Sequence, residues 1–303
     1  MKEMLLTANI HAGTGMVRDH LAELIDYYVS LGYDVTVHTS QKPRELIDYI
    51  GENGDKYELL VSTGGDGTLN ETLNGLMKCD TPPVLCYLPA GTVNDFATSL
   101  KIPKEMEEAA KLVENGVPFC CDIGQFGEQY FSYVAAFGAF TEVAYQTPQA
   151  IKQIFGRLAY IVEGIKRLPN LRAYRMEIQG DDFELEEDFL FGMVTNSTSV
   201  GGFHFEDKIG IAMDDGYLEV VLVRMPRSMN ERQAIINGIM KQESVPGLLE
   251  WYRTKTLKIH SNERMPWTLD GEFGGEVEEV TISNCHQALK ILVPREDLQK
   301  EER

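Results

Sequence analysis

The chain has 303 residues, of which 43% are hydrophobic, and its formal net charge is −19. This length suggests about two domains, because a single core rarely grows beyond roughly 250–300 residues. The negative charge excludes nucleic acid as a partner, since a phosphate backbone would be repelled overall. No apolar run reaches the roughly 20 residues that a membrane-spanning helix needs.

Cysteine usage and the first residues indicate the compartment. The five cysteines are scattered, apart from the adjacent Cys120 and Cys121, and none has metal-ligand spacing. Their odd number argues against a disulfide framework. The first residues, Met1 to Leu6, enter a strand-like run directly and lack the design of a signal peptide. The sequence therefore predicts a cytoplasmic protein.

The first half of the chain alternates between strand and helix patterns. Strands are predicted at 4–8, 34–38, 57–61 and 84–88. Helices are predicted at 17–31, at 43–50 with Pro43 in its first turn, at 69–77 and at 104–115. This alternation predicts a Rossmann-like α/β domain with a parallel sheet, whose ligands bind at the carboxyl ends of the strands.

After Asp122 the pattern changes to short alternating runs. Antiparallel strands are predicted at 130–136, 174–178, 189–195, 217–223, 256–260, 279–283 and 289–293. Two helices, at 148–168 and 228–242, interrupt them. Such a series is typical of a β-sandwich. We therefore predict an α/β domain over 1–124 and a C-terminal antiparallel β-sandwich domain over 125–294, with a cleft between them.

A glycine-rich stretch at 61–72 joins the third predicted strand to a helix. It reads Val-Ser-Thr-Gly-Gly-Asp-Gly-Thr-Leu-Asn-Glu-Thr. Glycines let the backbone approach a ligand closely, and the first N–H groups of the helix favour an anion. Asp66 would repel a phosphate unless a cation lies between them, so we expect a nucleotide that arrives with Mg²⁺. The alternative is a tight strand–helix turn capped by Asp66 and Thr68.

Two sequence blocks carry a resemblance to known kinases. The run Gly64-Gly65-Asp66-Gly67-Thr68 resembles the nucleotide motif of diacylglycerol kinases, sphingosine kinases, NAD kinases and, more loosely, phosphofructokinases. The continuation Leu69-Asn70-Glu71 resembles the lipid-kinase branch, as does the second block, Pro89-Ala90-Gly91-Thr92-Val93-Asn94-Asp95-Phe96-Ala97. From the first strand to the last segment, the order of features resembles the soluble bacterial diacylglycerol kinase family.

The resemblance implies an ATP site at the carboxyl ends of the first strands. Its residues are Asn9, Gly13, Thr39, Gly64, Gly65, Asp66, Gly67, Thr68, Leu69, Asn70, Glu71 and Thr92, with Asn94 and Asp95 beside them. Family members usually have Asn-Pro in the first loop, whereas this chain has Asn9-Ile10. The resemblance also implies that the tail, 295–303, returns to the first domain.

The acceptor side is predicted from the run Trp267-Thr268-Leu269-Asp270-Gly271-Glu272. It matches the Asp-Gly-Glu motif of lipid kinases, and the resemblance implies that Glu272 accepts the proton of the lipid hydroxyl. Asp66 is the second predicted catalytic residue, because it would face the cation of the nucleotide. The alternative for Asp270 and Gly271 is a hairpin turn between two strands.

A second Asp-Gly turn reads Ala212-Met213-Asp214-Asp215-Gly216-Tyr217. The resemblance implies a structural Mg²⁺ site with the carboxylate of Asp215 and the carbonyls of Ala212 and Tyr217, and oxygen ligands suit this hard cation. A plain β-turn is the alternative. Asp122, at the predicted domain junction, either bridges through water to a metal near the nucleotide or is a hinge residue that makes hydrogen bonds.

One segment, 151–175, is basic in this acidic chain. A basic, apolar helix of this kind suits docking on an anionic membrane surface, while an ordinary amphipathic helix with a solvated face explains it equally well. A homodimer is suggested by the family resemblance alone. The segment has a single acid, Glu163, against the basic residues Lys152, Arg157, Lys166, Arg167, Arg172 and Arg175.

These features predict an ATP- and Mg²⁺-dependent lipid kinase that converts diacylglycerol to phosphatidic acid. Three alternatives are open: a kinase of phosphatidylglycerol, a sphingoid base or a polyprenol; an NAD kinase; and a nucleotide sensor without turnover. The second block and the Asp-Gly-Glu run disfavour NAD kinase, and the presence of Glu272 argues against a sensor.

Overall fold

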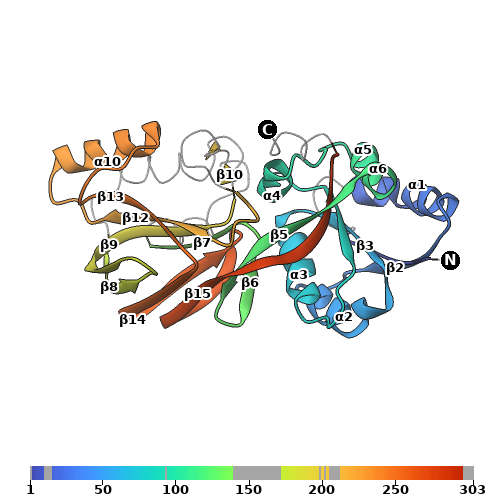
Figure 1. Cartoon of the computed structure of the whole chain (residues 1–303), viewed down its shortest axis with the longest axis horizontal. Helices are drawn as coiled ribbons and strands as arrows, with labels where there is room; N and C mark the ends of the chain where they lie inside the picture. The colour runs from blue at the N-terminus through green and yellow to red at the C-terminus, as the bar shows by residue number, and fades with distance from the viewer. Residues whose placement is uncertain are drawn as a thin grey trace. The chain divides into compact units, whose positions relative to one another are not determined.

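The computed structural model describes residues 2–9, 16–92, 94–138, 172–197, 199–200, 203–204 and 212–295. The chain divides into two compact units, one of Met1–Cys121 with Gln287–Arg303 and one of Asp122–His286 (Figure 1). The second unit therefore begins at Asp122, and the chain returns to the first unit at Gln287. The sequence analysis predicted these two boundaries at 125 and 295.

The first unit is built on a parallel sheet. Its strands are β1 (Lys2–Ala8), β2 (Tyr33–Thr39), β3 (Leu59–Gly64) and β4 (Val84–Pro89), in the order β4-β3-β1-β2. Near the end of β15 (Glu272–Val293), Ile291 pairs with Leu85 of β4, also in parallel. The parallel pairing agrees with the strand–helix alternation of the sequence.

Helices follow these strands as the apolar spacing predicts. They are α1 (Met16–Ser30), α2 (Glu45–Asn53) with the 3₁₀ turn η1 (Gly54–Lys56), α3 (Asp66–Leu76), α4 (Asp95–Ser99), α5 (Met106–Ala110) and α6 (Leu112–Asn115). In α3, Leu69, Leu73 and Leu76 recur at helical spacing and are buried.

Two helix predictions were wrong in detail. The helix predicted over 104–115 is broken into α5 and α6 at Lys111. Pro43 does not lie in the first turn of α2, because Arg44 has left-handed backbone angles and the helix begins only at Glu45. In both cases the apolar spacing located the helical region; it missed the interruption at Lys111, whose backbone angles remain right-handed, and the left-handed residue Arg44.

The second unit is mostly antiparallel. Its main path is β13 (Leu249–Thr254), β12 (Leu218–Arg224), β9 (Glu184–Thr195), β7 (Val134–Gly138), β14 (Thr256–Leu269) and β15. β8 (Tyr174–Gln179) pairs with β9 and β14, and β6 (Gln129–Phe131) pairs with β5 (Val117–Phe126). Among the described residues, the remaining elements of this unit are α10 (Met229–Lys241) and the short pair β10 (Ser199–Val200) and β11 (Phe203–His204).

Antiparallel pairing agrees with the alternating sequence, while the division into the two layers of a sandwich stays a prediction. β15 is one strand that covers both predicted runs at 279–283 and 289–293. β13 was missed, because this terminal strand is only partly buried and shows no clear apolar alternation. Where alternation is clear, as in β8, the pattern holds: Tyr174, Met176 and Ile178 are buried and their neighbours are exposed.

The core of the second unit is centred on Trp267 of β14, which is fully buried. Its ring lies 5.0 Å from that of Phe126 and 4.9 Å from that of Phe137, both tilted, which is a favourable geometry for aromatic pairs. Because Trp267 lies only a few residues before the Asp270–Gly271 turn, the core holds the strand that leads into this part of the predicted site.

No helix among the described residues is both long and apolar enough to cross a membrane. Most of the basic segment 151–175, with the predicted helix at 148–168, lies outside the described residues, as does 296–303. Two of its basic residues are described. Arg172 pairs with Glu263 at 2.5 Å and Arg175 with Glu186 at 2.9 Å, so acidic neighbours offset both positive charges.

Candidate active site

The glycine-rich turn lies where the sequence predicts it, between β3 and α3. β3 ends at Gly64, and α3 begins at Asp66 after the extended N-cap Gly65. A Cβ on Gly64 would lie 2.5 Å from the Thr68 side chain, so only glycine fits there. The first N–H groups of an α-helix have no partner within the helix, and with the helix dipole such groups favour an anion.

A second loop, after β4, touches this turn backbone to backbone. A Cβ on Gly91 would lie 2.6 Å from the Cα of Gly65, well inside van der Waals contact. The N–H of Ala90 donates to the Gly64 carbonyl at 2.8 Å. The two sequence blocks that carry the kinase resemblance therefore form one structure at the carboxyl ends of β3 and β4.

Asn94 braces the two loops from within. Its backbone is left-handed, with φ 54°. Its side-chain Oδ1 accepts from the Gly91 N–H at 3.1 Å, and its Nδ2 donates to the Gly91 carbonyl at 2.9 Å. Its own N–H donates to Asp66 Oδ2 at 3.1 Å. The Asn94 amide, predicted to lie at the nucleotide, is thus engaged within the protein and sets the position of Asp66.

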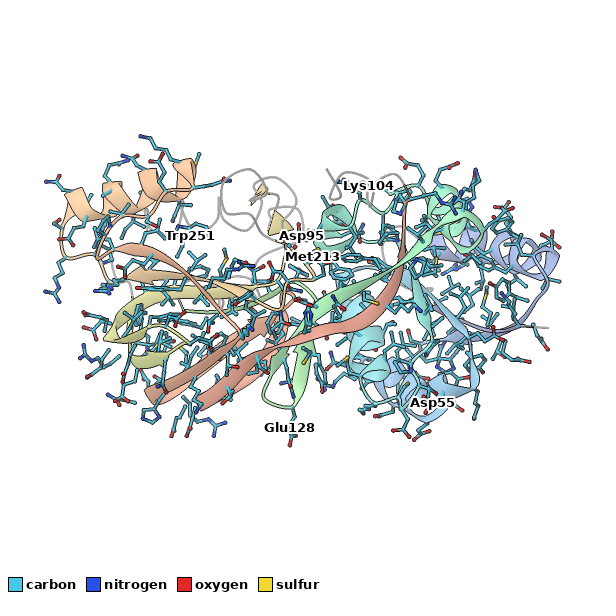
Figure 2. All side chains as sticks on the ribbon, viewed as in Figure 1. Asp55, Asp95, Lys104, Glu128, Met213 and Trp251 are labelled. Carbon is cyan, nitrogen blue, oxygen red and sulfur yellow. The ribbon has the colours of Figure 1, made fainter. Side chains whose placement is uncertain are left out.

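Asp95 follows Asn94 and opens α4 (Figure 2). Its side chain is buried, and so is most of the short helix it begins. Asp66 and Asp95 thus stand at the N-terminal ends of two helices that the Asn94 loop ties together. Thr92, on the outer part of the loop, is exposed and available to a ligand.

Glu71, also predicted at the nucleotide, caps another helix. Its Oε1 accepts from the Arg44 N–H at 2.8 Å and its Oε2 from the Leu46 N–H at 3.4 Å. These contacts satisfy N–H groups at the start of α2. The carboxylate therefore connects α3 to α2, and its negative charge interacts favourably with the N-terminus of α2.

The ends of β1 and β2 lie at the same edge of the sheet. The N–H of Asn9 donates to the Thr63 carbonyl at 3.3 Å, and its Nδ2 donates to Thr68 Oγ1 at 3.5 Å. Thr39, at the end of β2, accepts from the Gln41 side chain through both its carbonyl and its Oγ1. Parallel strands place these residues together, as the sequence predicts.

The remaining predicted nucleotide residues differ in what they can offer. The Leu69 side chain is fully buried in the core, which leaves only its backbone for a ligand. Asn70 accepts from Asn74 Nδ2 through its carbonyl at 2.9 Å and its side chain at 3.3 Å. Gly67 lies in the first turn of α3, and Gly13 lies outside the described residues.

In the second unit, Asp270 and Gly271 form the turn of the β14–β15 hairpin. Their φ angles are 50° and 84°, and Leu269 pairs with Glu272 across the turn. Two consecutive residues with positive φ are what a two-residue type I′ turn requires. The turn places Glu272 as the first residue of β15, with its side chain exposed. The hairpin interpretation is therefore correct and compatible with a catalytic Glu272.

The Asp270 carboxylate anchors this hairpin, a role that sequence reasoning missed. It is only 2% exposed. Its Oδ2 accepts from the Ser132 N–H at 2.7 Å and the Ser132 Oγ at 2.9 Å, and its Oδ1 accepts from the N–H groups of Tyr133 at 3.0 Å and Val134 at 3.1 Å. The motif contains this acid, yet only the structure shows that it holds the turn before Glu272 against residues 132–134.

The predicted metal turn is closed by local contacts. Asp215 Oδ1 accepts from the Tyr217 N–H at 2.9 Å, and its Oδ2 pairs with the Arg253 guanidinium. The Tyr217 carbonyl accepts from Asn284 Nδ2 at 2.9 Å. Gly216 has φ 79°, as a tight turn requires. The turn interpretation fits, and the carbonyl and carboxylate oxygens retain further lone pairs for a cation.

Glu219 lies beside this turn and is almost fully buried. Its Oε2 has no hydrogen-bond partner within the described segments, and its Oε1 lies 3.6 Å from Arg253 Nε. Burial, with a contribution from Asp215, raises the pKa of Glu219 to about 8, against the lowering effect of Arg253. Within the described part of the chain, no group of three or more His, Cys, Asp or Glu side chains is arranged to hold a metal ion.

Asp122 makes several hydrogen bonds within the second unit. Its Oδ2 accepts from the Gly216 N–H at 2.6 Å and from Asn284 Nδ2 at 3.1 Å, while its Oδ1 lies 2.9 Å from His286 Nδ1. Its N–H donates to the carbonyl of Met213 at 2.6 Å (Met213 is labelled in Figure 2). These contacts connect the turn at 212–217 to β5 and β15. The predicted water bridge from Asp122 to a metal near the nucleotide stays a prediction.

Comparison with known proteins agrees with these motifs. The diacylglycerol kinase catalytic domain family matches residues 3–126, which include both glycine loops. The chain is 30% identical over 300 residues to the diacylglycerol kinase of Bacillus subtilis strain 168, with 98% of each chain covered. It is 28% identical over 303 residues to that of Staphylococcus epidermidis strain RP62A, with 99% of this chain and 95% of the relative covered.

A solved structure shows the same fold. It is the crystal structure of a candidate diacylglycerol kinase from Bacillus anthracis strain Sterne, similar with a TM-score of 0.82 at 24% identity. The similarity covers 97% of this chain and 96% of the other. From the near full-length identity to the Bacillus subtilis relative, the chain belongs to the bacterial diacylglycerol kinase family of lipid kinases.

Proposed function

We propose that the protein transfers the γ-phosphate of ATP to the free hydroxyl of diacylglycerol, which yields phosphatidic acid and ADP. The observation that carries the proposal is the glycine-rich N-terminus of α3, held against the Gly91 loop in a chain of this family. Diacylglycerol is favoured as acceptor because the relatives that this chain matches over nearly their whole length are named diacylglycerol kinases.

The first unit would bind the triphosphate. Phosphoryl transfer is mostly positioning and neutralisation of charge. The protein therefore needs N–H groups that bind the phosphates, and a cation between the phosphates and the acidic side chains of the site. The first turn of α3 offers the N–H groups, and the absence of side chains on Gly64, Gly65 and Gly91 lets this turn pack closely against Thr68 and the second loop. Bound Mg²⁺ would neutralise the phosphate charge, and Asp66, oriented by Asn94, suits a role facing it.

The second unit would supply the base. Glu272 takes the proton of the acceptor hydroxyl as the new O–P bond forms and the bond between the γ-phosphate and ADP breaks. The rigid hairpin favours this role, because a base must be held in place to act on the hydroxyl. Phe273, the next residue, is 55% exposed and offers an apolar surface to a lipid chain.

A lipid panel tests the proposal. The protein is incubated with radiolabelled ATP, MgCl₂ and vesicles that contain diacylglycerol, phosphatidylglycerol, a sphingoid base or a polyprenol, and the lipid extract is separated. We expect label only in phosphatidic acid. Label in another lipid would reassign the acceptor, conversion of NAD to NADP in a coupled assay would indicate the rival kinase, and no labelled product at all would refute the proposal.

We also propose that the turn at Asp215 holds a structural Mg²⁺, with the carbonyls of Ala212 and Tyr217. The residues fit a hard cation, because oxygen atoms dominate the site and the buried Oε2 of Glu219 has no hydrogen-bond partner among the described residues. Arg253 pairs with Asp215, so Mg²⁺ would have to share this carboxylate with the guanidinium or displace it. The site would stabilise the turn and take no part in the transfer itself.

Thermal unfolding with and without MgCl₂ tests this site. We expect Mg²⁺ to raise the Tm of the wild type and of the control Asp182→Asn, an exposed acid elsewhere in the second unit, and not that of Asp215→Asn. An equal rise in Asp215→Asn would place the ion elsewhere, and no rise in the wild type would refute the site.

A further inference from the structure

We propose that Tyr87 is a positioning residue for the nucleotide: its hydroxyl orients the Gly64 carbonyl and the Asn94 side chain, and so presents the N–H groups of the glycine turn to phosphate. The inference rests on the ATP site proposed above. Tyr87 lies on β4, outside the motif blocks, and is fully buried.

The first contact acts on the peptide that opens the turn. The Tyr87 hydroxyl donates to the Gly64 carbonyl at 3.0 Å, and the Ala90 N–H donates to the same oxygen at 2.8 Å. A carbonyl oxygen has two lone pairs, and these two donors use both. The oxygen, which would repel a phosphate, is thus held among protein donors.

The direction of this carbonyl decides the direction of the next N–H. A trans peptide is planar, so the Gly65 N–H points opposite to the Gly64 carbonyl. Holding the carbonyl toward Tyr87 and Ala90 therefore turns the Gly65 N–H away from them. Because Gly65 is the N-cap of α3, this N–H joins the donors at the helix N-terminus.

The second contact reaches the other loop. The Tyr87 hydroxyl also lies 3.4 Å from Asn94 Oδ1, the atom that accepts from the Gly91 N–H. The Asn94 N–H in turn holds Asp66 Oδ2. One buried hydroxyl is thus shared between both motif loops. Burial, and next to it the charge of Asp66, raises the pKa of Tyr87, so this hydroxyl keeps its proton and remains a donor.

The chain provides a matched control in Tyr28. It lies on α1 in the same unit and is equally buried, but its hydroxyl has no hydrogen-bond partner among the residues that the structure describes. Tyr28→Phe and Tyr87→Phe make the same chemical change at equal burial. Any difference between them therefore reports the contacts to Gly64 and Asn94, and a general effect of losing a buried hydroxyl appears in both.

The experiment measures KM for ATP, kcat, KM for the lipid and Tm in the full-length wild type and both variants. We expect Tyr87→Phe to raise KM for ATP roughly five- to tenfold, the loss typical of a hydrogen bond in a binding site, with kcat at saturating ATP within about twofold. The KM for the lipid should not change. Tyr28→Phe should match the wild type in all kinetic constants.

Two results would overturn the inference: a wild-type KM for ATP in Tyr87→Phe, whatever its Tm, or an equal rise in Tyr28→Phe. If Tyr87→Phe does not fold, Asn94→Gly takes its place, because it removes the second acceptor and keeps the left-handed backbone that glycine favours. It should raise KM for ATP at least roughly threefold, and no change would count against the inference. If the wild-type protein does not bind ATP, the proposed function itself is refuted.

Discussion

Replacing Glu272 by glutamine is expected to lower kcat by roughly 10²- to 10⁴-fold, the usual contribution of a general base. The amide has nearly the same size and cannot take up the proton of the lipid hydroxyl. Because the Glu272 side chain is exposed, Tm should stay at the wild-type value, and KM for ATP should not change. Initial rates at saturating ATP and diacylglycerol give the result.

Glu276→Gln is the matched control for this experiment. Glu276 lies on the same strand and is exposed, and its backbone carbonyl accepts from Arg264 Nη2 at 2.7 Å. This variant should retain wild-type activity. If Glu272→Gln also retained it, the base would have to be another group, although the family assignment would stand.

Asp270→Ala is expected to destabilise the protein by about 3–5 kcal/mol, because each of the four donors that lose an acceptor costs on the order of 1 kcal/mol. Those donors are the N–H groups of Ser132, Tyr133 and Val134 and the hydroxyl of Ser132, all bound to the buried carboxylate. Urea unfolding followed by tryptophan fluorescence measures the loss, since Trp267 is fully buried in the same unit.

Asp270→Asn should lie between the wild type and Asp270→Ala, because one amide oxygen still accepts while the NH₂ group faces N–H donors. Activity should fall with stability in both variants, as the hairpin that carries Glu272 loosens. An Asp270→Ala protein within about 1 kcal/mol of the wild type would show that water replaces the carboxylate, and that the anchor contributes little.

The nucleotide turn could be predicted from sequence because its causes are local. A glycine cluster between a strand pattern and a helix pattern is enough to place Gly64, Gly65 and the start of α3. The motif did not show which side chains face a ligand. Glu71 and Asn94 fall in motif blocks, yet one caps α2 and the other braces a loop, and both depend on tertiary contacts.

The same limit applies to the aromatic and acidic residues of the site. Tyr28 and Tyr87 both look like core tyrosines in sequence. Only the fold places one hydroxyl against the Gly64 carbonyl and near Asn94 Oδ1, and leaves the other without a partner in the described part of the chain. Asp270 looked like a turn residue, which it is. Its contacts with Ser132 and Val134 could not be predicted, because they join segments more than a hundred residues apart.

The Asp270 anchor also affects when the protein can finish folding during synthesis. Asp270 binds the N–H of Ser132 across 138 positions of sequence, and Ile291 is the residue that adds β15 to the sheet of the first unit. Contacts of such long range form late, after the intervening chain has left the ribosome. A nascent chain halted near position 260 therefore leaves both units incomplete at once, with hydrated amides at 132–134 and an unpaired edge on β4.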